Sequence, residues 1–308
     1  MKWLLINRFP VSFRVGFLIA GVQKAGTFSL FQLLRQHPNI GTSKIKEVHF
    51  FDDDVAVDWS KPAYDRYHGH FANKPGKTIF GEATPIYIYW PKALERIKAY
   101  NPDIKLILLF RDPIDRAYSA WCHQMKKGRE TLTFADAIRS GRERITDVCN
   151  FDVCNFAKRH FSYVERGFYA RQLSRVLEEF PKANVLALES RQLAVAPSRV
   201  VQTTSMFLGL DSTGQSLTPS HANKRSSDAN RLPPSAEDIR LLADLFALDL
   251  EKFVSLVDFP IDHWLTFRLL SGSVSPKEVA AELAEPGFGK MVSEVPERDQ
   301  SPKLTDRL

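Results

Sequence analysis

A short apolar run that leads into a glycine-containing loop, and then into a helical pattern, constrains the fold of this 308-residue chain most. Residues Phe17–Gly21 form the apolar run, and the loop behind it contains Lys24 and Gly26. Over residues 27–36 apolar side chains recur at the spacing of one helix face, and His37-Pro38 closes the pattern. A strand, a loop and a helix in this order predict a parallel sheet covered by helices.

A second strand is predicted at Ile104–Phe110, which is almost continuously apolar, as a central strand of a parallel sheet should be. Arg111-Asp112-Pro113 follows, and Pro113 suits the first turn of a helix. The sequence therefore predicts an α/β protein with a P-loop-type three-layer fold, a central parallel sheet flanked by helices. One domain over residues 1–285 and a polar, disordered tail over 286–308 are expected. Further strands are predicted at 78–82 and 184–189, further helices at 91–100, 113–127, 134–144, 168–180, 197–208 and 235–257, and a long loop at 211–234.

The first loop has the features of an anion cradle. Gly21 and Gly26 have the spacing of a Walker A motif, but Thr27 stands in the lysine position and Lys24 lies inside the loop. Backbone N–H groups of such a loop converge on an anion, and the following helix directs its positive end at it. The net charge of +6 also suits an anionic ligand. The alternative is a tight strand-to-helix turn without a ligand.

Two segments resemble the donor-binding segments of sulfotransferases that use 3′-phosphoadenosine 5′-phosphosulfate (PAPS). Gly21–Thr27 is similar to their 5′-phosphosulfate loop, and Phe110–Ser119 is similar to their 3′-phosphate-binding segment. The resemblance covers roughly residues 15–265. It implies donor contacts from Gln23, Lys24, Ala25, Gly26, Thr27, Phe28, Ser29, Arg111 and Ser119, and from Lys224 and Arg225 in a basic loop that closes over the donor. A solvated basic turn is the alternative for the last two.

Lys46–Asp52 is similar to the segment that carries the catalytic glutamate in the heparan-sulfate branch of that family. The resemblance implies that Glu47 is the general base, with His49 as the alternative base, and that Lys24 stabilises the sulfonate and the departing oxygen. Gly81–Pro85 is similar to the next signature of that branch, but Ala83 stands where a lysine is common. This departure weakens the case for a heparan-like acceptor.

The resemblance implies transfer of a sulfonate group to a hydroxyl or amine of an acceptor such as a glycan, with 3′-phosphoadenosine 5′-phosphate (PAP) as the product. One rival is a P-loop kinase or hydrolase. Against this rival, the sequence lacks the Walker A lysine that should stand directly before Ser or Thr. In its favour, Asp112 at a strand end would serve as the acidic Mg²⁺ ligand. The other rival is a binding module without chemistry, against which the retained Lys24 and Glu47 argue. For Glu47 a solvated charge, and for His49 a core histidine, are the plain alternatives.

Several partner classes are not indicated. The sequence has no cluster with metal-ligand spacing and no Lys/Arg run typical of nucleic-acid binding. The apolar runs near the N-terminus fall short of the ~20 residues of a membrane helix, and the pattern of a signal peptide is missing. The odd count of cysteines, Cys122, Cys149 and Cys154, fits a reducing compartment, so a cytoplasmic protein is expected.

Overall fold

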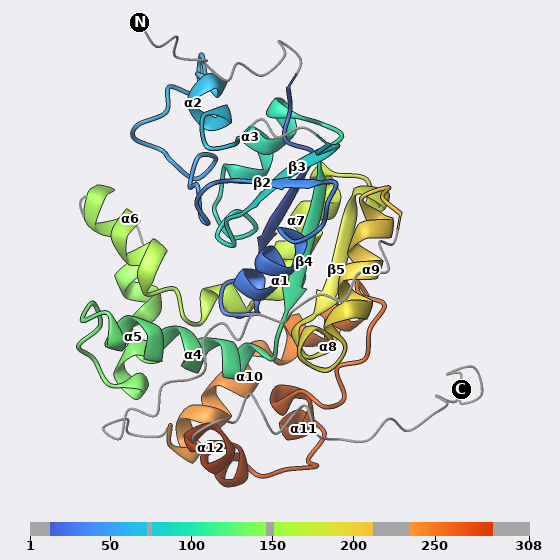
Figure 1. Ribbon diagram of the computed structural model, residues 1–308. Helices are drawn as coiled ribbons and strands as arrows, with labels where there is room; N and C mark the ends of the chain where they lie inside the picture. Colours follow the sequence, from blue (N-terminus) through green and yellow to red (C-terminus); the bar gives the residue numbers. More distant parts are fainter. Residues whose placement is uncertain (1–12, 73–75, 146–150, 212–233, 286–308) are drawn as a thin grey trace, which may run out of the picture.

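A five-stranded parallel sheet forms the centre of the molecule in the computed structural model, which describes residues 13–72, 76–145, 151–211 and 234–285. The strand order is β2-β3-β1-β4-β5, and every neighbouring pair is parallel (Figure 1). All five strands therefore end at one edge, which is where ligands bind in sheets of this kind. The strands are β1 (Phe17–Gly21), β2 (Ile40–Thr42), β3 (Ile79–Ala83), β4 (Lys105–Phe110) and β5 (Val185–Glu189).

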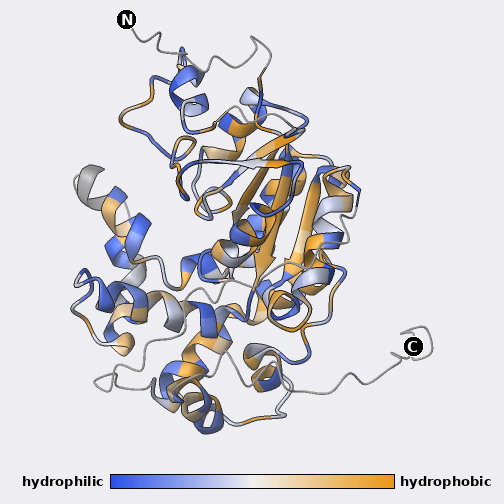
Figure 2. Cartoon of the chain, in the orientation of Figure 1, coloured by the Kyte–Doolittle hydropathy of each residue, from blue (hydrophilic) through white to orange (hydrophobic). Residues whose placement is uncertain are grey.

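The two central strands, β1 and β4, are buried almost throughout because helices cover both faces of the sheet. Their ribbons are coloured mostly as hydrophobic in Figure 2. Phe17 pairs with Gly81 of β3 on one side and with Lys105 of β4 on the other. This register brings the carboxyl ends of β1, β3 and β4 together, so the loops after these strands are neighbours.

Helices lie on both faces of the sheet (Figure 1). On one face α1 (Thr27–Leu34) packs against α9 (Pro197–Phe207), and on the other α3 (Ala93–Tyr100) packs against α7 (Tyr169–Glu179). Right-handed crossovers require this division, because the chain moves in opposite directions along the sheet after β1 and after β3. The result is the predicted three-layer arrangement.

A second apolar core lies beyond the carboxyl ends of the strands. Side chains of α4 (Pro113–Lys126), α5 (Phe134–Ile145) and α10 (Ala236–Val254) build it together with α11 (Leu265–Leu270) and α12 (Pro276–Ala284). The helices α10 to α12 gather below the end of β4 in Figure 1. The remaining elements are α2 (Tyr64–His68), α6 (Phe151–His160), α8 (Ser190–Val195) and two 3₁₀ turns, Glu165–Gly167 and Lys182–Asn184.

The predicted α/β fold with a central parallel sheet is confirmed. The predicted strands all form, and β2 is an additional edge strand of three residues. Most of the predicted long loop, with Lys224 and Arg225, and the predicted tail at 286–308 lie outside the described residues. In the part of the chain that the structure describes, no helix is both long and apolar enough to cross a membrane.

Candidate active site

The loop between β1 and α1 has the geometry of an anion cradle. Gly26 is the N-cap of α1 with φ 91°, a left-handed conformation that glycine adopts without strain. A Cβ at this position would also lie 3.3 Å from Leu193 of α8. Thr27 begins the helix and is buried, and the first turn of α1 contains no acidic residue. No carboxylate of the first turn therefore neutralises the positive N-terminal end of the α1 dipole, which can attract an anion.

Arg111 joins this loop to the second predicted donor segment. Its Nη1 donates to the carbonyl oxygen of Lys24 at 2.9 Å. Its Nε and Nη2 both lie 2.5 Å from Oδ2 of Asp115, which follows four residues later in the first turn of α4. Ser119 lies on the same helix and is buried. Arg111 of the second segment thus contacts the first segment, and a carboxylate fixes its guanidinium plane.

The segment that carries Glu47 lies at the end of β3 and has an unusual backbone conformation. Glu47 has φ 62° and His49 has φ 55°. The Glu47 amide donates to the Ala83 carbonyl at 2.9 Å, which ties Glu47 to the end of β3. Lys24 has φ 72°. Among the described residues these three are the non-glycine residues with a left-handed φ. Such conformations cost free energy and concentrate at functional sites.

Charged side chains form a chain behind Glu47. Lys46 pairs with Oε1 of Glu47, and Nε2 of His49 lies 3.7 Å from Oε2. Nδ1 of His49 donates to Oδ2 of the buried Asp52 at 2.9 Å. Arg159 of α6 binds the same carboxylate and stacks on Trp90, with its guanidinium carbon 4.3 Å from the ring centroid. His49 is therefore held from both sides by carboxylates, while Glu47 keeps 42% of its side chain exposed.

These contacts set the protonation of the segment. Burial favours neutral Glu47, but the hydrogen bond with His49 and the charge of Lys46 outweigh it and lower the pKa of Glu47 to about 2. Burial opposes the charging of His49, but the bonds to Asp52 and Glu47 raise the pKa of His49 to about 9. At neutral pH, Glu47 is a carboxylate and His49 is an imidazolium.

Lys24 interacts electrostatically with Glu47, Lys46 and Arg111. Burial, reinforced by the charge of Arg111, lowers the pKa of Lys24 to about 8, while Glu47 acts in the opposite direction. Burial lowers the pKa of His123 on α4 to about 4, and the charge of Lys24 adds to that effect. The ammonium group therefore lies among Arg111, Glu47 and α4, with a proton that is lost more easily than that of an ordinary lysine.

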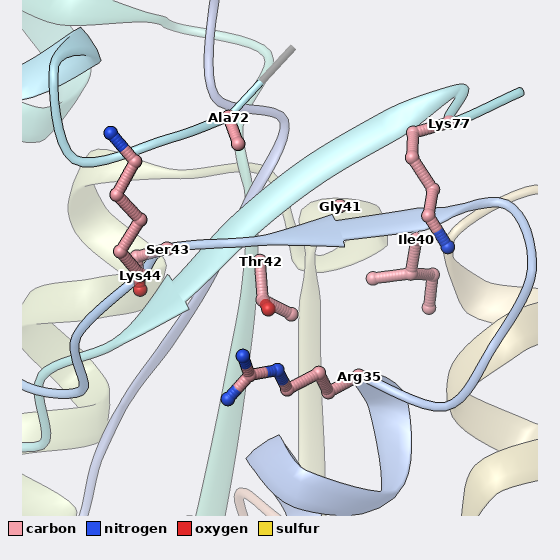
Figure 3. Close-up of a pocket in the computed structure, with 8 residues that line it drawn as sticks. All are labelled: Arg35, Ile40, Gly41, Thr42, Ser43, Lys44, Ala72 and Lys77. Atoms are coloured by element: carbon pink, nitrogen blue, oxygen red, sulfur yellow. The ribbon is translucent and has the colours of Figure 1, made fainter. Parts of the chain in front are cut away.

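A separate hollow of about 120 Å³ opens beside the edge strand β2. Its lining includes the cationic side chains of Arg35, Lys44 and Lys77 (Figure 3). The ammonium groups of Lys44 and Lys77 donate to the backbone carbonyls of Gly69 and His37, each at 3.0 Å. None of the predicted site residues lines this hollow, so it is distinct from the site between the two loops.

Comparison with known proteins assigns the fold to a family. The model of the sulfotransferase domain matches residues 16–232. The chain belongs to the sulfotransferase domain family. The match spans both donor-type segments, the Glu47 segment and the whole sheet.

The similar proteins are sulfotransferases as well. The human heparan sulfate glucosamine 3-O-sulfotransferase 6 is 31% identical over 209 residues, which cover 66% of this chain and 53% of that protein. The human 3-O-sulfotransferase 3B1 is 29% identical over 197 residues, covering 63% of this chain and 45% of that protein. The chain thus spans about half the length of the curated relatives it matches. A solved sulfotransferase from Alicyclobacillus acidocaldarius superposes with a TM-score of 0.65 at 27% identity, over 82% of this chain and 99% of that one.

The structure brings three predicted segments to one end of the sheet: Gly21–Thr27, Lys46–Asp52 and Phe110–Ser119. Lys224 and Arg225 stay predictions. Sequence reasoning missed Asp52, Arg159 and Asp115. Asp52 and Asp115 carry a local signal, because they follow His49 and Arg111 by three and four residues. Arg159 is 107 residues from Asp52, and no local pattern links the two. The described residues contain no group of His, Cys, Asp and Glu side chains able to hold a metal ion.

Proposed function

We propose that this chain transfers a sulfonate group from PAPS to a hydroxyl group of a carbohydrate acceptor and releases PAP. One observation carries the proposal. The described non-glycine residues with a left-handed backbone are Lys24, Glu47 and His49, the same three that the family resemblance assigns to catalysis. The carbohydrate acceptor is supported by two relatives that are named as heparan sulfate glucosamine 3-O-sulfotransferases.

In this proposal the two loops hold the donor. The N-terminal turn of α1 and Lys24 face the 5′-phosphosulfate, and Arg111 and Ser119 face the 3′-phosphate. The acceptor oxygen forms a bond to sulfur as the bond from sulfur to the bridging oxygen of PAPS breaks. Positive charge from Lys24 stabilises the bridging oxygen, which leaves on the phosphate of PAP. Positioning and charge supply the catalysis, since the transferred group needs no covalent bond to the protein.

The acceptor proton passes to Glu47. His49 is the weaker candidate for the base because its raised pKa of about 9 keeps it protonated at neutral pH. Glu47 is ionised, half exposed and ready to accept a proton. Its low pKa makes it a weak base in the free protein, and an acceptor that displaces Lys46 would raise that pKa. His49 and Asp52 then orient Glu47.

Calorimetric titration with PAP tests the donor assignment. Wild-type protein should bind PAP, and Arg111→Ala should weaken the binding by about tenfold or more, because a charge-assisted contact to a phosphate is lost. Arg35→Ala, which removes an exposed arginine at the separate hollow, is the matched control and should bind normally. Turnover of ATP with Mg²⁺, without binding of PAP, would instead support a kinase or hydrolase.

A further inference from the structure

A single buried carboxylate connects two helices next to the donor segment. Oδ1 of Asp112 accepts the backbone N–H of Asp115 at 2.8 Å and so caps α4. Oδ2 of Asp112 accepts both the N–H and the hydroxyl of Thr266 on α11, each at 2.7 Å. Asp112 and Thr266 are both buried. The start of α4 is therefore fastened to α11, which lies 154 residues further along the chain.

This contact continues as a relay to the donor loops. The amide of Asp115 is held by Asp112, and the carboxylate of Asp115 holds the guanidinium of Arg111 at 2.5 Å. Arg111 in turn donates to the carbonyl of Lys24 in the phosphate-type loop. A continuous series of polar contacts therefore connects Thr266 on α11 with Lys24 in the candidate active site.

The helix that carries Thr266 belongs to a part of the chain beyond the family match, which ends at residue 232. Helices α10, α11 and α12 contact one another, and both α10 and α11 contact α4. Phe246 of α10 also lies so close to Gly167 that a Cβ there would come within 2.5 Å of its ring. Helices α10 and α11 therefore pack on α4, the helix that begins two residues after Arg111.

We propose that Thr266 is a positioning residue for the donor site, and that its two hydrogen bonds to Asp112 form a brace that keeps Arg111 in its donor-binding position. This inference rests on the proposed function of Arg111. Without the Thr266 hydroxyl, the buried Asp112 side chain has lost one of its hydrogen bonds. The turn at 111–113 then spends part of its time in other conformations. The apparent affinity for the donor then decreases in proportion to the fraction of molecules that remain in the binding-competent conformation.

Titration of PAP into three variants of the full chain tests the brace. Thr266→Val keeps the shape of the side chain and removes the hydroxyl, and its dissociation constant for PAP should rise about tenfold. Thr266→Ser keeps the hydroxyl and loses a buried methyl group, so it should bind PAP like the wild type even though it melts at a lower temperature.

Asp238→Asn is the control for general loosening of the same helices. Asp238 completes the capping box of α10 with the N-cap residue Ser235 and pairs with Arg139 of α5 at 2.5 Å, outside the relay. It should lower the melting temperature and leave PAP binding unchanged. Wild-type affinity in Thr266→Val, or an equal loss in Asp238→Asn, would overturn the positioning role while the donor assignment stands. Failure of the wild type itself to bind PAP would overturn both.

Discussion

At the scale of single residues, the site combines strained backbone with shifted protonation. Against the effect of burial, Asp52 and Glu47 keep His49 protonated, and His49 and Lys46 keep Glu47 ionised at neutral pH. Lys24 holds its proton loosely because it is buried beside Arg111. Perturbed groups of this kind cluster where charge develops during a reaction. Two substitutions separate their roles.

Replacement of Glu47 by glutamine should remove the base and spare the donor site. Turnover should fall by about 100-fold or more, while the affinity for PAP stays at the wild-type value. The measurement is a steady-state sulfonate-transfer assay beside a PAP titration. An undiminished turnover number in Glu47→Gln would rule out this carboxylate as the base.

The lowered pKa of Lys24 predicts an alkaline limit to activity. As the pH rises through about 8, the ammonium loses its proton, and kcat/KM for the donor should fall. Lys24→Arg keeps its charge over that range, so its profile should lose this limb even if its rate is lower. A profile that falls at the same pH in the wild type and in Lys24→Arg would assign the limb to another group.

At the scale of elements, the β3 end and the segment after it hold the Glu47 loop in place. The Glu47 amide bonds to Ala83, and the amide of Phe50 donates to the hydroxyl of the buried Tyr87 at 3.2 Å. Two fixed points, one before and one after His49, maintain the left-handed backbone of the loop between them.

Tyr87→Phe should therefore lower kcat several-fold, because the buried Phe50 amide loses its acceptor and the loop loses one fixed point. PAP affinity should not change, since the donor loops lie elsewhere. Tyr67→Phe is the control: its ring stacks on Phe50 at 4.9 Å, but its hydroxyl is not the acceptor of the Phe50 amide. Equal kcat values for the two variants would contradict a role of the Tyr87 hydroxyl in placing the loop.

The elements that could be predicted from sequence are those whose own residues determine them. β4 is apolar throughout and α4 begins with a proline, so both were recognisable. β2 has only three residues and takes its structure from pairing with β3. α8 is separated from α9 by Ala196 alone, and its six residues carry no clear periodicity. At the site, the contacts of Arg159 with Asp52 and of Thr266 with Asp112 depend on tertiary packing, which spacing along the chain does not reveal.

At the scale of the whole molecule, one buried carboxyl group links stability to pH. Burial raises the pKa of Glu82 from 4.5 to about 7, against the hydrogen bond from Thr84 at 2.6 Å. The folded protein therefore binds more protons than the unfolded chain between these values, and the contribution of Glu82 to stability decreases as the pH rises through them.

Glu82→Gln removes this charge and keeps the shape of the side chain. Its melting temperature, relative to the wild type, should be higher at about pH 8 than at about pH 5, because only the wild type has to bury an ionised group at the higher pH. Differential scanning calorimetry at both pH values gives the comparison. A difference that does not change with pH would show that Glu82 titrates normally in the folded protein.

In the proposed function, the two loops and the Glu47 segment together carry out sulfonate transfer from PAPS. The most direct test follows radiolabelled sulfonate from PAPS into a panel of glycans, with wild-type protein and with Lys24→Ala. The wild type should give a labelled glycan and release one PAP per transfer. A Lys24→Ala variant that melts like the wild type should show no transfer, because the charge at the bridging oxygen is lost. Equal transfer by both proteins, or no labelled glycan from a wild type that binds PAP, would rule out this function.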